Sequence, residues 1–238
     1  MLTDSSRGIQ SGRLTPNIHL PSTAKLELLN FIATELPLWR DHPDRPATST
    51  ETTLTEHLCD YLNSATSNSL IWSHIQFRTE TGDETRIGRK IDLSVKPRSS
   101  IIFIEGRRHT LFDALFPIEC KRLPTPKEKD RDEHEYVITK AGTTGGIQRF
   151  KFGYHGAKHN FAAMIAYVQQ QSFKHWFGQI NLWIQELADE PNSIWNKTDF
   201  LLLLSNNPNT GISTLKSQHL RSGGLNILDL HHLWIKMS

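Results

Sequence analysis

The sequence lacks the features that mark several classes of protein. Its two cysteines, Cys59 and Cys120, are too few for a disulfide framework, and neither has a second cysteine nearby to form a zinc site. No apolar run approaches the ~18–20 residues that cross a bilayer, and the first residues hold no apolar segment typical of a secretory signal. We therefore expect a cytoplasmic protein with no membrane partner.

Neither the net charge nor internal repeats indicate a function or a repeat architecture. The formal net charge is +2, so charge alone does not argue for a nucleic-acid partner. No internal repeat is evident. The 238 residues are 37% hydrophobic and 22% charged, which is a globular composition and enough chain for one substantial domain with an N-terminal extension.

Hydrophobic periodicity divides the chain into elements. We expect a polar tail over 1–21, helices over 22–36 and 50–63, a proline-containing linker over 41–49, strands over 70–79, 89–96, 101–104 and 115–123, an exposed loop over 127–135, a buried helix over 157–171, a helix over 178–188, a buried strand over 200–204 and a last strand over 225–235. This order predicts an α/β (α+β) fold with a mixed central sheet flanked by helices. Residues 1–49 would form a tail, helix and linker, and residues 50–238 the main domain.

Three charged residues lie inside otherwise apolar strands. Because side chains alternate between the faces of a strand, Asp92 points away from its apolar neighbours, and Glu119 and Lys121 share the face opposite Cys120. Asp92 and Glu119, placed side by side, would repel unless a cation lay between them. Such oxygen ligands suit Mg²⁺ or Mn²⁺. Lys121 would then orient or help to deprotonate the attacking water, or stabilise charge on a phosphate. The alternative is a purely structural salt bridge.

The pattern of Asp92, 26 residues and then Glu119-Cys120-Lys121 resembles the motif of the PD-(D/E)XK nuclease superfamily. The resemblance covers roughly residues 50–170, and it departs from the motif's name in having Ile91 in place of proline. It implies a restriction-endonuclease-like fold and a nuclease dependent on Mg²⁺ or Mn²⁺. Asp92 and Glu119 would be metal ligands and Lys121 a catalytic residue.

The superfamily also places a glutamate on a helix before these strands, where this chain offers Glu51 and Glu56. Glu51 precedes Leu54 by three residues and Leu58 by seven, so it lies on the apolar, inward face of the expected helix. We therefore expect Glu51 to be the third metal ligand and catalytic carboxylate. Its alternative role is a first-turn acid that complements the helix dipole.

Polar residues follow the lysine strand, after a glycine-rich turn. Members of the superfamily often place a Gln, Arg or Lys there, near the metal or the scissile phosphate. Gln148 is our candidate for a catalytic role, and Arg149 and Lys151 are candidates for nucleic-acid binding. The alternative is a polar helix face in water. His155 and His159 have no evident third ligand for a metal, so we expect solvated histidines.

We therefore expect a metal-dependent nuclease that cuts DNA as the effector of a bacterial anti-phage or restriction system. No helix-turn-helix or zinc finger is recognisable, so loops of this chain, a protein partner or homo-oligomerisation would supply target choice. Two alternatives remain open: a nucleic-acid-binding or scaffold subunit that does not cut, and an RNA-cleaving toxin.

Overall fold

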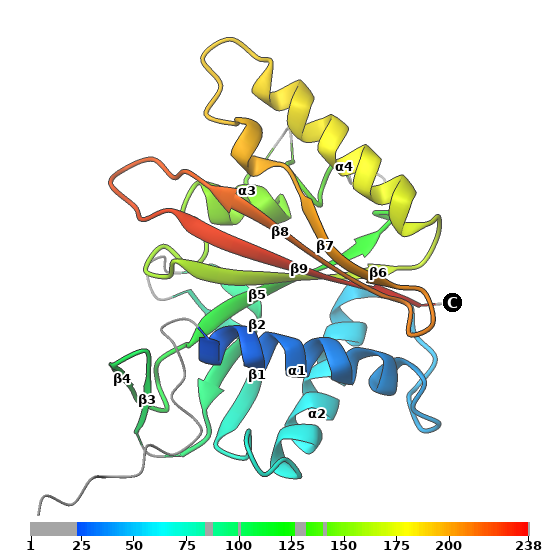
Figure 1. The fold of residues 1–238 in the computed structure, drawn as a ribbon, viewed down its shortest axis with the longest axis vertical. Coiled ribbons are helices and arrows are strands. Elements are labelled where there is room, and N and C mark those ends of the chain that lie inside the picture. The colour runs from blue at the N-terminus through cyan, green and yellow to red at the C-terminus, as the bar shows by residue number, and fades with distance from the viewer. Residues whose placement is uncertain (1–22, 84–87, 100, 127–131, 140–141, 238) are drawn as a thin grey trace, which may run out of the picture.

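A mixed seven-stranded sheet forms the centre of the molecule (Figure 1). The computed structural model describes residues 23–83, 88–99, 101–126, 132–139 and 142–237. The strand order is β1 (Ile75–Gly82), β2 (Lys90–Pro97), β5 (Phe116–Leu123), β6 (Phe161–Val168), β9 (Leu228–Lys236), β8 (Ile212–His219) and β7 (Leu202–Asn207). Only the β5–β6 and β6–β9 pairs are parallel. The short strands β3 (Ile102–Ile104) and β4 (Arg107–His109) pair separately.

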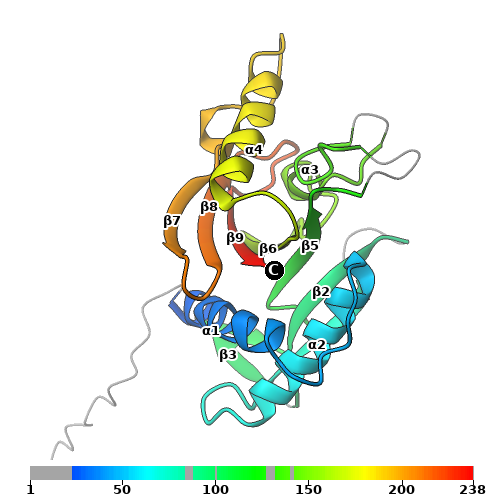
Figure 2. The ribbon, with the colours of Figure 1, turned by 90° about the vertical axis from the view of Figure 1, so that its right-hand side faces the viewer.

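Helices cover both faces of this sheet, as Figure 2 shows. On one face lie α1 (Thr23–Arg40) and α2 (Glu51–Ser67), and on the other lie α3 (Gly146–Lys151) and α4 (Phe173–Ala188). A 3-10 turn, η1 (Lys197–Asp199), precedes β7. The mixed α/β class expected from the sequence is confirmed. None of the helices in the described part of the chain has the length and apolar character needed to cross a membrane.

Each face of the sheet carries its own hydrophobic core. Leu28, Ile32 and Leu36 of α1 share one core with Leu54 and Leu58 of α2. The opposite core is formed by α3, α4 and the other face of the central strands. The packing shows no break at residue 49, because α1 is buried against the same sheet and the same helix as the rest of the chain.

Two expected elements differ from the structure. The buried helix expected over 157–171 is wrong, because residues 161–168 form β6. All eight residues of β6 are buried, since it is a central parallel strand with both faces covered, and such a strand is as continuously apolar as a buried helix. Residues 202–204 do form a strand, but β7 is an edge strand and its leucines are exposed rather than buried. The strand β8 had no counterpart among the expected elements.

Candidate active site

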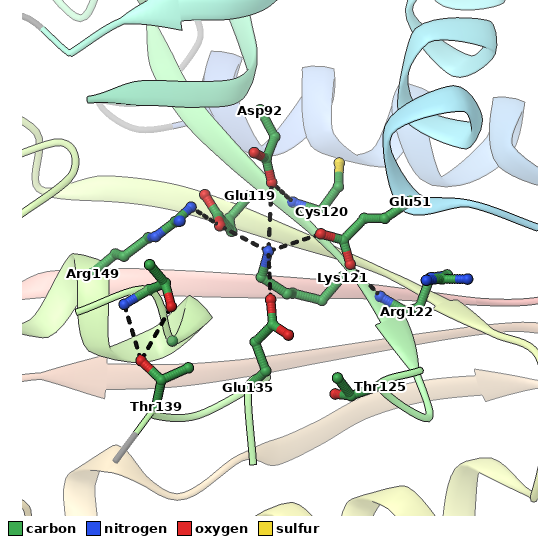
Figure 3. Close-up of polar contacts among 12 residues, drawn as sticks. Glu51, Asp92, Glu119, Cys120, Lys121, Arg122, Thr125, Glu135, Thr139 and Arg149 are labelled. Carbon is green, nitrogen blue, oxygen red and sulfur yellow. Dashed lines mark hydrogen bonds and ion pairs between the residues drawn. The ribbon is translucent and has the colours of Figure 1, made fainter. Parts of the chain in front are cut away.

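The structure brings together the four acidic and basic residues that the motif singled out. Glu51 Oε1 lies 3.0 Å from Lys121 Nζ, Glu119 Oε1 lies 3.1 Å from it and Asp92 Oδ2 lies 3.9 Å from it. Figure 3 shows the ammonium group in the middle of these carboxylates. The cluster joins the first turn of α2 to the neighbouring strands β2 and β5.

Strand register and one hydrogen bond place Asp92. The β2–β5 register pairs Leu93 with Ile118, so Asp92 lies beside Glu119 on the next pair of positions. The backbone N–H of Cys120 donates to Asp92 Oδ2 at 2.9 Å and fixes the carboxylate against β5. The side chain of Asp92 is still 28% exposed, so it can be reached from solvent.

The helix acid is Glu51, as its position on the apolar face of the helix predicted. Thr50 caps α2, and Glu51 is the first helical residue. One carboxylate oxygen of Glu51 contacts Lys121, and the other accepts from the backbone N–H of Arg122 at 2.9 Å. Glu56, the alternative, is exposed to solvent.

Glu119 is the most strongly paired carboxylate of the cluster. Its side chain is fully buried, and its Oε1 binds both Lys121 and the guanidinium of Arg149. His155 Nδ1 lies 3.3 Å from Oε2, but Oε2 has no hydrogen-bond partner in the described part of the protein. Burial would raise the pKa of Glu119, but Lys121, His155 and Arg149 together outweigh burial and lower it to about 2. Glu119 is therefore ionised at all ordinary pH values.

Asp92 is the carboxyl group of the cluster whose pKa is raised. Burial and the neighbouring charge of Glu119 raise its pKa to about 7, and the more distant Lys121 compensates only in part. The expected repulsion between the two carboxylates therefore raises the pKa of Asp92 only. The pKa of Glu119 stays low because Lys121 and Arg149 lie closer to Glu119.

Lys121 remains an ammonium ion at neutral pH. Burial would lower its pKa, but the charges of Glu119, Asp92 and Glu51 raise it above its usual value. A lysine in this state can donate hydrogen bonds and neutralise an anion. As long as these carboxylates face its ammonium group, Lys121 does not favour the role of a base that deprotonates water, which was one of the roles expected from the sequence.

Two further residues belong to the site, and the sequence analysis missed both. Glu135 Oε1 lies 3.8 Å from Lys121 Nζ, although the loop that ends at this residue was expected to be exposed. The buried pair Tyr136 and Val137 that follows was the available signal, because it shows the chain returning to the core. His155 is buried beside Glu119, so the expectation of a solvated histidine is wrong.

The three polar residues of α3 have three different environments. Arg149 joins the site through Glu119. Gln148 Oε1 accepts from the backbone N–H of Gly145 at 3.2 Å and of Thr139 at 3.3 Å, so this side chain caps the helix and ties down the preceding loop. Its amide is directed at the loop and not at the carboxylates, which does not support the catalytic role expected for it.

Lys151 does not reach the site. It is fully buried, and its ammonium binds Asp199 at 2.8 Å. The nucleic-acid contact expected for Lys151 is therefore wrong, because a phosphate cannot reach a charge that is enclosed and already paired.

A chain of buried hydrogen bonds continues from Asp199. Asp199 binds His219, which binds Ser217 at 2.8 Å, and Ser217 Oγ lies 2.9 Å from His232. The other ring nitrogen of His232 contacts the hydroxyl of Tyr136, to which Trp234 donates. We call the connected side chains Lys151, Asp199, His219, Ser217, His232, Tyr136 and Trp234 the buried polar network.

Asp92 borders two hollows. One, of about 420 Å³, is also lined by Arg89, Lys90, Arg149 and His155. The other, of about 60 Å³, lies beside Glu51. A hollow of about 450 Å³ at α1, β8 and β9 is larger than either, but none of its lining residues belongs to the cluster. The larger hollow next to the cluster is therefore the one that Asp92 and Arg149 both line.

The cluster fits a divalent cation by its chemistry. Glu51, Asp92 and Glu119 supply only oxygen ligands, which suits Mg²⁺ or Mn²⁺. Among the described residues, Glu119 Oε2 has no hydrogen-bond partner and only His155 nearby, and the pKa of Asp92 is raised, so both carboxylates would be stabilised by a further positive charge. Among the described residues, no three acidic, histidine or cysteine side chains are already grouped to hold a metal, because Lys121 Nζ lies among the carboxylates.

Comparisons of this chain with protein-family models, curated proteins and solved structures found no match. The geometry of the cluster, and a short motif that resembles that of the PD-(D/E)XK superfamily, are therefore the guides to its function.

Proposed function

We propose that this protein is a metal-dependent nuclease that hydrolyses phosphodiester bonds at the cluster around Lys121. One observation carries the proposal: Glu51, Asp92 and Glu119, from three separate elements, converge on one lysine beside a hollow that Arg149 also lines. A fourth carboxylate, Glu135, adds to the negative charge.

The charge balance favours a reactive site over a structural salt bridge. A stable buried ion pair needs geometry that satisfies all of its partners. Here four carboxylates face the two permanent cations Lys121 and Arg149, and one buried oxygen of Glu119 has no hydrogen-bond partner. A group with this excess of negative charge is suited to receive a further cation.

The side chains divide into two roles. Glu51, Asp92 and Glu119 would hold the metal, which when bound lowers the pKa of a coordinated water and polarises a phosphoryl oxygen. Lys121 and Arg149 would neutralise the negative charge that grows on the phosphate and on the leaving oxygen. In this hydrolysis the water oxygen bonds to phosphorus, the opposite P–O bond breaks and the leaving oxygen gains a proton.

DNA is the proposed substrate on the basis of the resemblance to the superfamily alone. The test is to incubate wild-type protein and Glu119→Gln with single-stranded DNA, linear and supercoiled double-stranded DNA, and RNA. Each reaction is run with Mg²⁺, Mn²⁺ or EDTA. We expect wild type to cut DNA only with a divalent cation, and Glu119→Gln to be inactive.

Each other outcome has a defined meaning. Cleavage of RNA alone would identify an RNA-cutting enzyme. Binding of nucleic acid without cleavage in either cation would favour the scaffold alternative. Cleavage that persists in EDTA, or that is equal in wild type and Glu119→Gln, would contradict the proposed site.

A further inference from the structure

Among the described residues that line the hollow beside Asp92, one basic side chain has no acidic partner. Three basic side chains line it: Arg89, Lys90 and Arg149. Lys90 pairs with Glu80, and Arg149 pairs with Glu119. Within the described residues, Arg89 makes no ion pair with a carboxylate, although it lies three residues before Asp92. Its charge is therefore available to an anion that enters the hollow.

Neutral side chains hold Arg89 in place. The centre of its guanidinium lies 4.3 Å from the ring centroid of Tyr154, and its Nη2 donates to Thr143 Oγ1 at 3.2 Å. The ring of Tyr154 is in turn stacked on Phe152, with the centroids 5.7 Å apart and an interplanar angle of 18°. These contacts orient the guanidinium without neutralising it, and the remaining N–H groups keep the planar geometry that suits a phosphate.

The position of Arg89 relates it to the reacting centre. It shares the hollow with Asp92 of the carboxylate cluster and with Arg149, which is bound to Glu119. A nucleic-acid strand carries a negative charge at every phosphate. A strand with one phosphate at the cluster would have a neighbouring phosphate in the same basic hollow.

We propose that Arg89, held by Tyr154 and Thr143, forms a binding site for a phosphate of the nucleic-acid substrate that neighbours the scissile one. This inference rests on the proposed nuclease function. It assigns Arg89 to substrate binding and not to the chemical step.

The test measures binding without cleavage. Wild type, Arg89→Gln, Arg89→Lys and Tyr154→Leu are titrated in EDTA against fluorescently labelled single- and double-stranded DNA at several salt concentrations. Arg108→Gln, which alters an exposed arginine on β4, is the matched control. Thermal unfolding of each variant shows whether it is folded.

We expect Arg89→Gln to weaken binding by about tenfold and to reduce the slope of log affinity against log salt by about one, because one phosphate contact is lost. Arg89→Lys should keep the salt slope but recover only part of the affinity, since it loses the planar contacts with Tyr154 and Thr143. Tyr154→Leu should lower the affinity and leave the salt slope unchanged. Arg108→Gln should bind as wild type does.

Equal affinity and equal salt slope for wild type and Arg89→Gln would overturn the inference. So would an Arg108→Gln variant that is affected as strongly as Arg89→Gln, because the effect would then be general electrostatics. Weakened binding by Arg89→Gln in a protein that never cleaves would support the phosphate site and contradict the proposed hydrolysis. No binding of any nucleic acid by wild type would overturn both.

Discussion

Two buried lysines of this molecule have opposite surroundings. Lys151 lies in the buried polar network, where no side chain is more than 3% exposed and every polar group has a partner. Lys121 lies in a cluster in which Asp92 and Glu51 are partly exposed. One carboxylate oxygen of its Glu119 has no hydrogen-bond partner among the described residues. Around Lys151 the charged groups are buried and paired with each other. Around Lys121 two of the acids are partly exposed, and the carboxylates outnumber the cations.

The comparison shows that residue types alone do not identify a reactive site. Asp199, His219 and Ser217 are hydrogen-bonded in the order of a serine hydrolase triad. All three are buried, and Ser217 Oγ is already shared between His219 and His232, although Ser217 also lines the hollow of about 450 Å³ at α1, β8 and β9. Unsatisfied negative charge, together with the exposed part of the Asp92 side chain, distinguishes the cluster around Lys121 from this network.

The largest expected effect is on cleavage by Lys121→Met. Loss of the ammonium should slow single-turnover cleavage by roughly 10²–10³-fold, the usual cost of removing one group that stabilises charge in the transition state. Quenched-flow or gel assays with excess enzyme measure this rate. Lys174→Met, on the exposed surface of α4, is the control and should cleave as wild type does. An unchanged rate in Lys121→Met would place the chemistry elsewhere.

The second effect is on folding, and it concerns the other lysine. Lys151→Met should lower the unfolding free energy by about 3–5 kcal/mol, because it leaves the carboxylate of Asp199 buried without its cation. Denaturant titration measures the loss, again against Lys174→Met. A loss below about 1 kcal/mol, the scale of an exposed ion pair, would show that the Lys151–Asp199 pair does not stabilise the fold as a buried ion pair should.

The third effect is a pH dependence of the network. Burial lowers the pKa of His219, despite the opposing influence of Asp199, and lowers the pKa of His232 far more. The unfolded chain takes up protons near pH 6.5 and the folded one does not, so stability should fall as the pH drops below 6.5. Both histidines should contribute to this loss, which begins as the pH falls through their unfolded pKa of about 6.5.

This loss is best measured by denaturant titration between pH 5 and 8 in Asp92→Asn, because Asp92 contributes in the opposite direction. Stability that is level or rises toward pH 5 in that variant would mean that the two histidines are not buried in neutral form.

The smallest expected effect separates the two carboxylates of the open cluster. The pKa of Asp92 is raised, so the stability it contributes is complete below its unfolded pKa near 4 and is lost as the pH rises through about 7. Asp92→Asn should therefore raise the metal-free unfolding free energy at pH 8, by on the order of 1 kcal/mol. Glu119→Gln should lower it, since the cations hold the pKa of Glu119 near 2. If both variants changed the unfolding free energy in the same direction, the raised pKa of Asp92 and the lowered pKa of Glu119 could not both be correct.

Local periodicity was enough to predict the core of the site. Strand alternation placed Glu119 and Lys121 on one face with Asp92 nearby, and helical spacing favoured Glu51 over Glu56. These relations involve residues within one element or one strand pair, so they follow from the sequence directly.

The remaining features depend on tertiary contacts that the sequence does not show. The helix α3 has six residues, which is too short for periodicity to tell that Arg149 faces the cluster while Lys151 is buried. Glu135 and His155 reach the site from loops, and the only signal in the sequence was the apolar pair Tyr136 and Val137 that follows Glu135. The strand β6 has no polar residue to reveal its period, and length alone did not separate it from a helix.

We expect the cluster around Lys121 to accept a divalent cation and the buried polar network not to. The most direct test compares the unfolding free energies of Lys121→Met and Lys151→Met with EDTA and with saturating Mn²⁺. We predict that Mn²⁺ stabilises Lys121→Met by about 2.7 kcal/mol at a hundred times its dissociation constant, and that this gain exceeds that of wild type, whose ammonium competes for the same oxygens. Lys151→Met should gain no more than wild type does. Equal gains in the two variants, or none in Lys121→Met, would contradict the account.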